Sequence, residues 1–171
     1  MITKIANIRA VRPIAENLDD TKRLNPYIAE TENLYLLPMI GAKIYEELDA
    51  YVNAESPTAN ATYDLLMNGG YYTHASERYQ FAGLKMAMGY LVYCRFLKNQ
   101  NLNVTAFGIT RKTSEFSEAS EERTVVRVAN DAEAIGKRYL QECYEYLSRM
   151  DVFETYRENK TSSRKYKIIG Q

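Results

Sequence analysis

Apolar residues recur every three or four positions along most of this chain, which is the period of an amphipathic helix. Between about residues 26 and 52 the pattern predicts two helices. Pro38 is expected to end the first helix, and Gly41 is expected to permit the turn into the second. The expected inward positions are Leu24, Tyr27, Ile28, Leu34, Tyr35, Ile44, Leu48, Tyr51 and Val52. The sequence therefore predicts a rigid helical corner.

Three further helices follow from the same pattern. A short helix is expected near residues 61–68, ending at Gly69. A second runs from about Ser76 to Asn99 and is apolar on nearly all sides, so other elements must cover it. A third opens at Glu121 and continues to about residue 150. The helix from Ser76 to Asn99 is thus the expected centre of the fold.

Two stretches do not follow the helical period. Residues 1–18 have isoleucines spaced by three and fit either a strand or a helix. Residues 100–120 are rich in β-branched residues, Ser, Thr and Gly, and are expected to form an extended loop or a small hairpin around Val104–Lys112. A connection of this length in a compact domain is more often functional or disordered than a plain linker.

The fold class expected from these elements is mainly α. We predict a compact helical bundle with a long central helix, a long C-terminal helix, and an extended loop or small β-hairpin between them. The expected organisation is an N-terminal arm (1–18), one helical domain (19–155) with the inserted loop 100–120, and a basic tail (156–171). A chain of 171 residues is long enough for one such domain with a sizeable core.

Charge and hydropathy exclude several classes of protein. Basic and acidic residues both number 22, so no global field attracts phosphates or an anionic membrane. The longest apolar run, Met86–Cys94, is about half of the roughly 20 residues that cross a bilayer. The N-terminus carries charges among its apolar residues and does not resemble a secretory signal. We therefore expect the protein to stay in the cytoplasm, where it is made, and to have no transmembrane segment.

No arrangement of residues predicts catalysis, a metal site or a cofactor. His74 is the single histidine, and the pattern places it at a helix start, where a solvated side chain is the favoured interpretation. Cys94 and Cys143 both lie inside helical patterns and are interpreted as buried free thiols. The chain has neither a glycine-rich phosphate loop nor a nucleophile elbow. It is therefore not expected to be an enzyme.

Surface chemistry suggests contacts between proteins instead. The chain contains 15 tyrosines, which supply contact area at interfaces or simply cap the core with wet hydroxyls. Acidic residues gather at the end of the long loop, and the segment from Arg157 to Gln171 carries five basic residues and one acidic. Negative charge at a helix start is favourable in itself. Opposite charge at two places would also orient identical copies head to tail.

Several stretches together resemble the head-tail connector (adaptor) proteins of tailed bacteriophages, especially those of Bacteroides-type phages and prophages. They are the opening N-x-D-D-x-x-R-L-N-P-Y-I from Asn17, the corner L-L-P-M-I-G-x-x-I-Y-E-E-L from Leu36, the apolar helix, the loop V-T-A-F-G-I-T-R-K-T-S-E-F-S-E-A-S from Val104, and the last helix. The resemblance spans roughly residues 5–155. These motifs shape a fold and carry no chemistry.

The resemblance implies a homo-oligomeric ring, expected to be a dodecamer, below the portal protein at the head-tail junction of the virion. Such a ring continues the channel for double-stranded DNA and docks the next neck or tail component. The implied loop facing the channel or the next ring is Phe107, Gly108, Ile109, Thr110 and Arg111. The implied acidic channel or interface residues are Glu115, Glu118 and Glu121, and the implied docking tail residues are Arg164, Lys165, Tyr166, Ile168 and Ile169. No sequence-specific DNA contact and no membrane contact are implied.

A second class of function is compatible with the same residues. The chain could fold as a monomeric or dimeric cytoplasmic module that uses its tyrosine-rich surface to bind or regulate a partner protein. Solution mass and association with a portal separate this alternative from a connector.

Overall fold

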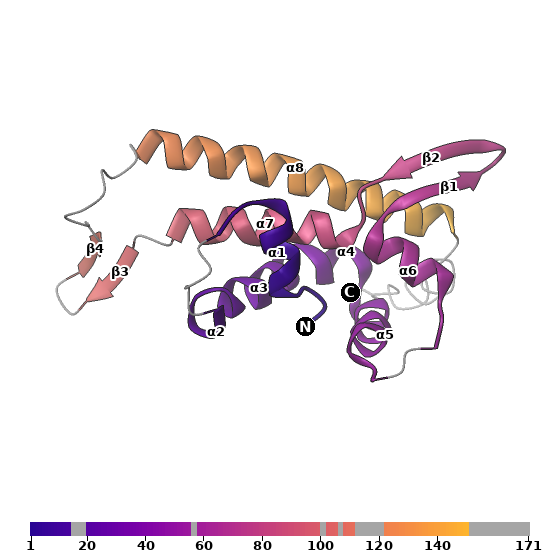
Figure 1. Ribbon diagram of the computed structural model, residues 1–171, viewed down its shortest axis with the longest axis horizontal. Coiled ribbons are helices and arrows are strands. Elements are labelled where there is room, and N and C mark those ends of the chain that lie inside the picture. Colours follow the sequence, from indigo (N-terminus) through magenta and orange to yellow (C-terminus); the bar gives the residue numbers. More distant parts are fainter. Residues whose placement is uncertain (15–19, 56–57, 100–101, 106–107, 112–121, 151–171) are drawn as a thin grey trace, which may run out of the picture.

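The computed structural model describes residues 1–14, 20–55, 58–99, 102–105, 108–111 and 122–150. Two long helices, α7 (Leu84–Asn99) and α8 (Glu122–Arg149), run side by side along the molecule (Figure 1). A hairpin of β3 (Leu102–Thr105) and β4 (Gly108–Arg111) lies between them in the chain. The predicted mainly helical fold, with two long helices and a small hairpin between them, is therefore confirmed.

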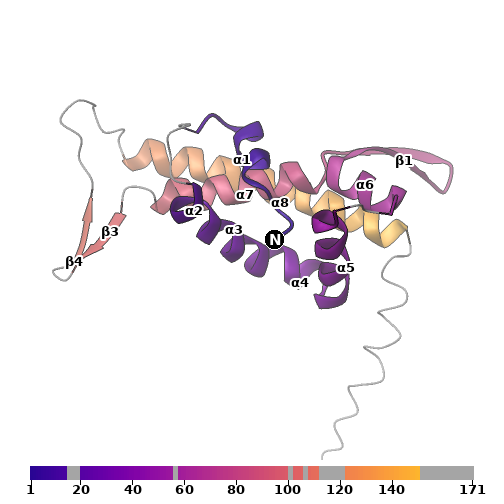
Figure 2. The same ribbon diagram turned by 60° about the horizontal axis from the view of Figure 1, so that its bottom comes forward.

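The helix α7 is the centre of the fold, as its apolar pattern predicts. Helix α8 covers one side of it, and α1 (Ile5–Val11) and α3 (Asn25–Thr31) cover others (Figures 1 and 2). Two glycines let these helices come close. A Cβ atom at Gly89 would lie 2.7 Å from the Asn7 carbonyl oxygen of α1, and one at Gly136 would lie 2.7 Å from Leu91 Cγ. The contacts of α7 with α1 and α8 therefore depend on the absence of side chains at these positions.

The N-terminal residues, which fit either strand or helix by sequence, form the helix α1. Ile8 and Val11 are buried on this helix, and Ile2 before it joins the main hydrophobic core. A short helix, α2 (Asp20–Arg23), follows before α3. The first 14 residues thus contribute to the interior of the molecule.

The corner differs from its prediction at Leu34, which is 55% exposed instead of facing inward, and at Pro38. Helix α3 continues through a π-helical turn, η1 (Glu32–Leu36), into α4 (Leu37–Ile40), so Pro38 does not end the helix. Pro38 lies in the first turn of α4, where a missing N–H is tolerated, and the wider turn before it bonds the Leu37 N–H to the Glu32 carbonyl. The helix ends at Gly41, whose φ of 80° permits the predicted turn into α5 (Ala42–Asn53).

A second hairpin replaces the first part of the predicted helix from Ser76. The strands β1 (Gly70–His74) and β2 (Glu77–Phe81) follow α6 (Ala61–Asn68), and α7 begins only at Leu84. Tyr72 and Phe81 are buried in this hairpin, and apolar residues in alternation favour strands over a helix. His74 faces Glu77 across the two strands, so its predicted position at a helix start is wrong.

The remaining helices match the sequence pattern closely. Helix α6 ends before Gly69, and α8 spans Glu122–Arg149, as expected. Its buried positions include Ala129, Ala132, Leu140, Cys143 and Leu147, whereas Val128 is 36% exposed although it lies four positions from the buried Ala132. Cys94 and Cys143 are free and buried, as predicted. Among the described helices, none is long and apolar enough to cross a bilayer.

Candidate functional site

Few of the residues singled out from the sequence lie in the described part of the chain. Gly108, Ile109, Thr110 and Arg111 form β4, whose hairpin lies beyond the ends of α7 and α8 (Figures 1 and 2). The other members of the predicted loop, acidic surface and tail lie outside the described residues. They are Phe107, Glu115, Glu118, Glu121, Arg164, Lys165, Tyr166, Ile168 and Ile169. Their roles stay predictions.

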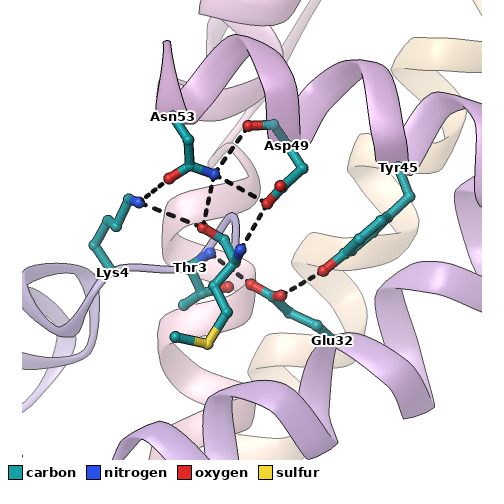
Figure 3. A network of polar contacts seen from close by, with 7 residues as sticks. Thr3, Lys4, Glu32, Tyr45, Asp49 and Asn53 are labelled. Atoms are coloured by element: carbon teal, nitrogen blue, oxygen red, sulfur yellow. Dashed lines mark hydrogen bonds and ion pairs between the residues drawn. The ribbon is translucent and has the colours of Figure 1, made fainter. Parts of the chain in front are cut away.

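A polar network joins the first residues of the chain to α5 and η1 (Figure 3). The Met1 amino group donates to Asp49 Oδ1 at 2.6 Å, and the Lys4 ammonium donates to the Asn53 side chain. The Asn53 amide donates in turn to the Met1 carbonyl at 3.3 Å. These contacts lie on the surface and fix the N-terminal residues against the last two turns of α5.

Glu32 lies beneath this network and is 1% exposed. Its Oε1 atom accepts from the Thr3 backbone N–H at 2.6 Å, and its Oε2 atom accepts from the Tyr45 hydroxyl at 2.7 Å (Figure 3). Burial, together with this hydrogen bond and the negative charge of Glu32, raises the pKa of Tyr45. The carboxylate therefore connects three segments of the chain through the interior.

A second carboxylate, Glu133 on α8, connects α8 to α7 and η1. Its oxygens lie 2.6 Å from the ammonium groups of Lys98 and Lys137, and the Tyr35 hydroxyl donates to it at 3.3 Å. The hydrogen bonds from Lys137 and Lys98 lower the pKa of Glu133 to about 2. The charged Glu133 side chain thus stabilises the contact between α7 and α8.

An aromatic cluster holds the β1–β2 hairpin on the end of α8. Tyr72 and Tyr79 face each other across the strands and stack at 5.3 Å, and Tyr72 meets the Tyr146 ring edge-on at 5.0 Å. The Arg149 guanidinium lies 4.0 Å from the centroid of Tyr79 and donates to the Tyr72 hydroxyl at 2.5 Å. On the opposite face of the hairpin Tyr71 is 55% exposed, and the Arg78 guanidinium lies over its ring. One face of the hairpin is therefore fixed, and the other presents an aromatic surface.

A hollow of about 500 Å³, here called the α5–α6 groove, lies between those two helices. Its lining residues are Glu47, Ala50, Tyr51, Ala54, Thr58, Ala59, Asn60 and Tyr63. The Tyr63 hydroxyl donates to Glu47 Oε2 at 2.8 Å, and the Tyr51 hydroxyl donates to Asp64 Oδ1 at 2.6 Å. The groove therefore combines two tyrosine rings with two carboxylates and is open to a ligand.

The described residues contain no group of His, Cys, Asp and Glu that could hold a metal ion. Burial raises the pKa of both thiols, that of Cys143 to about 12. A thiol with a raised pKa is a poor nucleophile at neutral pH. What these residues offer chemically is contact surface and charge.

Sequence reasoning missed Glu32, Glu133 and the groove, although two of them leave a signal. Glu32 lies four residues from both Ile28 and Leu36, so it occupies a core-facing position of the helix and must be paired there. Glu133 lies four residues before Lys137, which is the spacing of a helical ion pair. The groove depends on how α5 and α6 meet, which no local pattern specifies.

The comparisons with known proteins give one family and no further relatives. No curated protein and no solved structure matches the chain. One family model, described as a family of unknown function (DUF6712), matches residues 36–166. That match runs from the last residue of the π-helical turn through α8 and covers well over half of the sequence. The chain therefore belongs to the DUF6712 family.

Proposed function

We propose that this protein is a structural head-tail connector of a tailed bacteriophage. It would form a homo-oligomeric ring below the portal protein, continue the channel for double-stranded DNA, and dock the next neck or tail component. It would be made in the host cytoplasm and reside in the virion. The proposal begins with the resemblance of the corner and loop motifs to such proteins.

The observation that carries the proposal is the position of the β3–β4 hairpin. This hairpin lies past the ends of α7 and α8 and away from the helical body (Figures 1 and 2). An isolated two-stranded hairpin is marginally stable in water and needs further strands or a packed surface. A neighbouring copy, or the next component of an assembly, would supply that surface. A hairpin held out in this way suits a subunit of a larger structure.

Two other features are compatible with a ring subunit. The close α7–α8 contact, with no side chain at Gly136, would give each subunit of a ring a tightly packed body. Equal numbers of basic and acidic residues would let DNA pass without being held, because affinity for phosphates comes from cations. Glu115, Glu118 and Glu121, repeated around a ring, would add a repelling wall.

The test is to image the protein mixed with the portal protein of the same phage and to measure its mass in solution over a range of concentrations. We expect a closed ring on the portal, with the β3–β4 hairpin in contact with a neighbouring copy or facing the channel. The protein without portal is expected to be a monomer or a small oligomer. A protein that never associates with a portal and stays monomeric at all concentrations would instead favour the cytoplasmic binding module.

A further inference from the structure

Two tyrosine rings line the α5–α6 groove. Tyr51 and Tyr63 meet edge to face with their centroids 5.6 Å apart. The Tyr51 hydroxyl donates a hydrogen bond to Asp64, and the Tyr63 hydroxyl donates one to Glu47. Three small side chains, Ala50, Ala54 and Ala59, also line it. The groove thus combines apolar side chains with a carboxylate at each of its two tyrosine hydroxyls.

This chemistry recognises lysine or arginine on a peptide. Cations bind favourably over aromatic rings, and they form charge-assisted hydrogen bonds with carboxylates. Helices α5 and α6 together carry four carboxylates and one lysine, and they keep a net negative charge although the Met1 ammonium pairs with Asp49. Apolar side chains beside the cations would fill the space over the alanines. The fitting ligand is a basic peptide with apolar residues among its charges.

The chain itself contains such a peptide. The segment from Arg157 to Gln171 has five basic residues and one acidic, and it includes Tyr166, Ile168 and Ile169. Its charge is therefore complementary to that of the groove, and its apolar residues suit the tyrosine and alanine lining.

The place where the described chain ends also lies close to α6, which forms one side of the groove. Near the end of α8 the Tyr146 hydroxyl donates to the Thr62 carbonyl of α6 at 3.2 Å, and Thr62 is the neighbour of Tyr63 in the groove. The seven residues from Met150 to Arg157 span at most about 24 Å when extended. That reach is about twice the diameter of a helix, so the segment can pass around α6.

We infer that, in the free subunit, the α5–α6 groove binds the basic C-terminal segment of its own chain. Tethering makes this binding intramolecular, at an effective concentration that a separate copy matches only in an assembly. The inference goes beyond the proposed function and does not require it. Within a connector, the docked segment would be withheld from neighbouring copies until the ring forms.

The test measures the distance between the segment and the groove in the full-length protein. Spin labels are placed at Ala61→Cys, exposed beside the groove, and at Ser163→Cys in the segment; the buried Cys94 and Cys143 are controlled by labelling the unsubstituted protein. A short distance between the two labels is expected, and it should persist when labelled protein is diluted into an excess of unlabelled protein. Loss of the short distance on dilution would assign the segment to a neighbour's groove and overturn the inference, as would its absence at every concentration.

A pair of isosteric substitutions then tests the groove. Glu47→Gln with Asp64→Asn removes both charges but keeps an oxygen that accepts from each tyrosine, so the fold should be retained by circular dichroism. We expect the ratio of docked to free segment to fall about tenfold, as for the loss of two partly exposed ion pairs. The matched control, Asp131→Asn with Glu142→Gln on α8, removes the same charge elsewhere and should leave the ratio unchanged. Equal effects of the two pairs, or none from the groove pair, would overturn the inference.

Discussion

The Glu32 carboxylate accepts a 2.6 Å hydrogen bond from the backbone N–H of Thr3, which lies 29 positions earlier in the chain. The two groups meet in the interior, where Glu32 is 1% and Thr3 is 2% exposed. The other carboxylate oxygen accepts from Tyr45. One buried side chain thus satisfies a backbone donor of the N-terminal segment and a hydroxyl of α5 from the π-helical turn between α3 and α4.

Replacing Glu32 by alanine is therefore expected to destabilise the protein by about 2–4 kcal/mol, because two donors, one of them a fully buried backbone N–H, lose their acceptor. The free energy of unfolding is measured by urea denaturation. Glu32→Gln should cost less, since its amide oxygen still accepts one of the two hydrogen bonds. The control is Glu46→Ala on the exposed face of α5, expected within about 0.5 kcal/mol of the unsubstituted protein. Equal effects of Glu32→Ala and Glu46→Ala would contradict the assigned role.

Local patterns predicted the helices well because burial of one face has a period that the sequence displays. The limits of α6 follow from the Asn60 cap and from Gly69, and the turn at Gly41 follows from the positive φ that glycine permits. The prediction that Pro38 ends the helix was wrong because the effect of a proline depends on the helical turn before it. A regular α-helix would lose a hydrogen bond at this residue, whereas the π-helical turn accommodates it.

The β1–β2 hairpin escaped prediction for a different reason. Tyr79 and Phe81 are two positions apart, as on one face of a strand, but so short an alternation does not outweigh the long apolar helical pattern that follows it. The turn between the strands, Ala75–Ser76, lacks the Asn-Gly or Gly residues that normally mark a two-residue hairpin. The α5–α6 groove and the ion pair between Glu133 and α7 could not be predicted, because both arise from contacts between separate segments that a single sequence does not reveal.

Because of Glu133, the free energy of unfolding should depend on pH in the acid range. Its pKa is lowered to about 2 in the folded protein from the ordinary value of 4.5, so the folded protein binds this proton more weakly than the unfolded chain does. The resulting stabilisation is fully present above about pH 4.5 and is lost as the pH falls toward 2. Glu133→Gln is expected to lower the free energy of unfolding by about 1–2 kcal/mol at pH 7, after allowance for solvent screening.

The measurement for Glu133 compares urea denaturation of both proteins from pH 7 to pH 2. Their stabilities should converge through the acid range, because the protonated carboxyl no longer pairs with Lys98 and Lys137. Glu142→Gln, which removes one exposed pair with Arg138, serves as the control and should change stability by about 0.5 kcal/mol or less. A difference between Glu133→Gln and the unsubstituted protein that stays constant with pH would show that the ion pairs do not cause it.

The contact of α1 with α7 should fail when Gly89 becomes alanine. The new Cβ atom would lie 2.7 Å from the Asn7 backbone oxygen, which cannot rotate away as a side chain can. The cost of overpacking, about 1–3 kcal/mol, is expected to exceed the gain of about 1 kcal/mol in helix propensity. Relative to the unsubstituted protein, the Gly89→Ala variant should show a larger increase in amide hydrogen exchange in α1 than in the other helices. The reverse substitution at an exposed site, Ala134→Gly, should lower stability without selective loss of protection in α1.

The turn of the β1–β2 hairpin offers a stabilising change. Ala75 and Ser76 have φ values of 49° and 68°, in the left-handed region where residues other than glycine and asparagine are strained. Ala75→Asn with Ser76→Gly supplies the residues that a two-residue turn of this kind favours, and should raise the free energy of unfolding by about 1 kcal/mol. Ala75→Val should lower it, because β-branching worsens the strain. Thermal denaturation that ranks the two variants in the opposite order would contradict the turn assignment.

Assembly into a ring should depend on the β3–β4 hairpin. Replacing Leu102–Arg111 by a glycine–serine linker of the same length removes β3 and β4, which lie away from the helical body, so α7 and α8 should still pack and the circular dichroism and melting temperature should change little (Figure 1). If the hairpin supplies contacts between copies, the variant should no longer form a ring on the portal, as seen by electron microscopy and by sedimentation of the mixture. The Ala75→Asn with Ser76→Gly variant is the matched control, since it alters a hairpin turn but leaves β3–β4 intact, and it should assemble normally. A ring formed equally well without β3–β4 would remove the hairpin from the interface and leave the proposed connector without its main structural support.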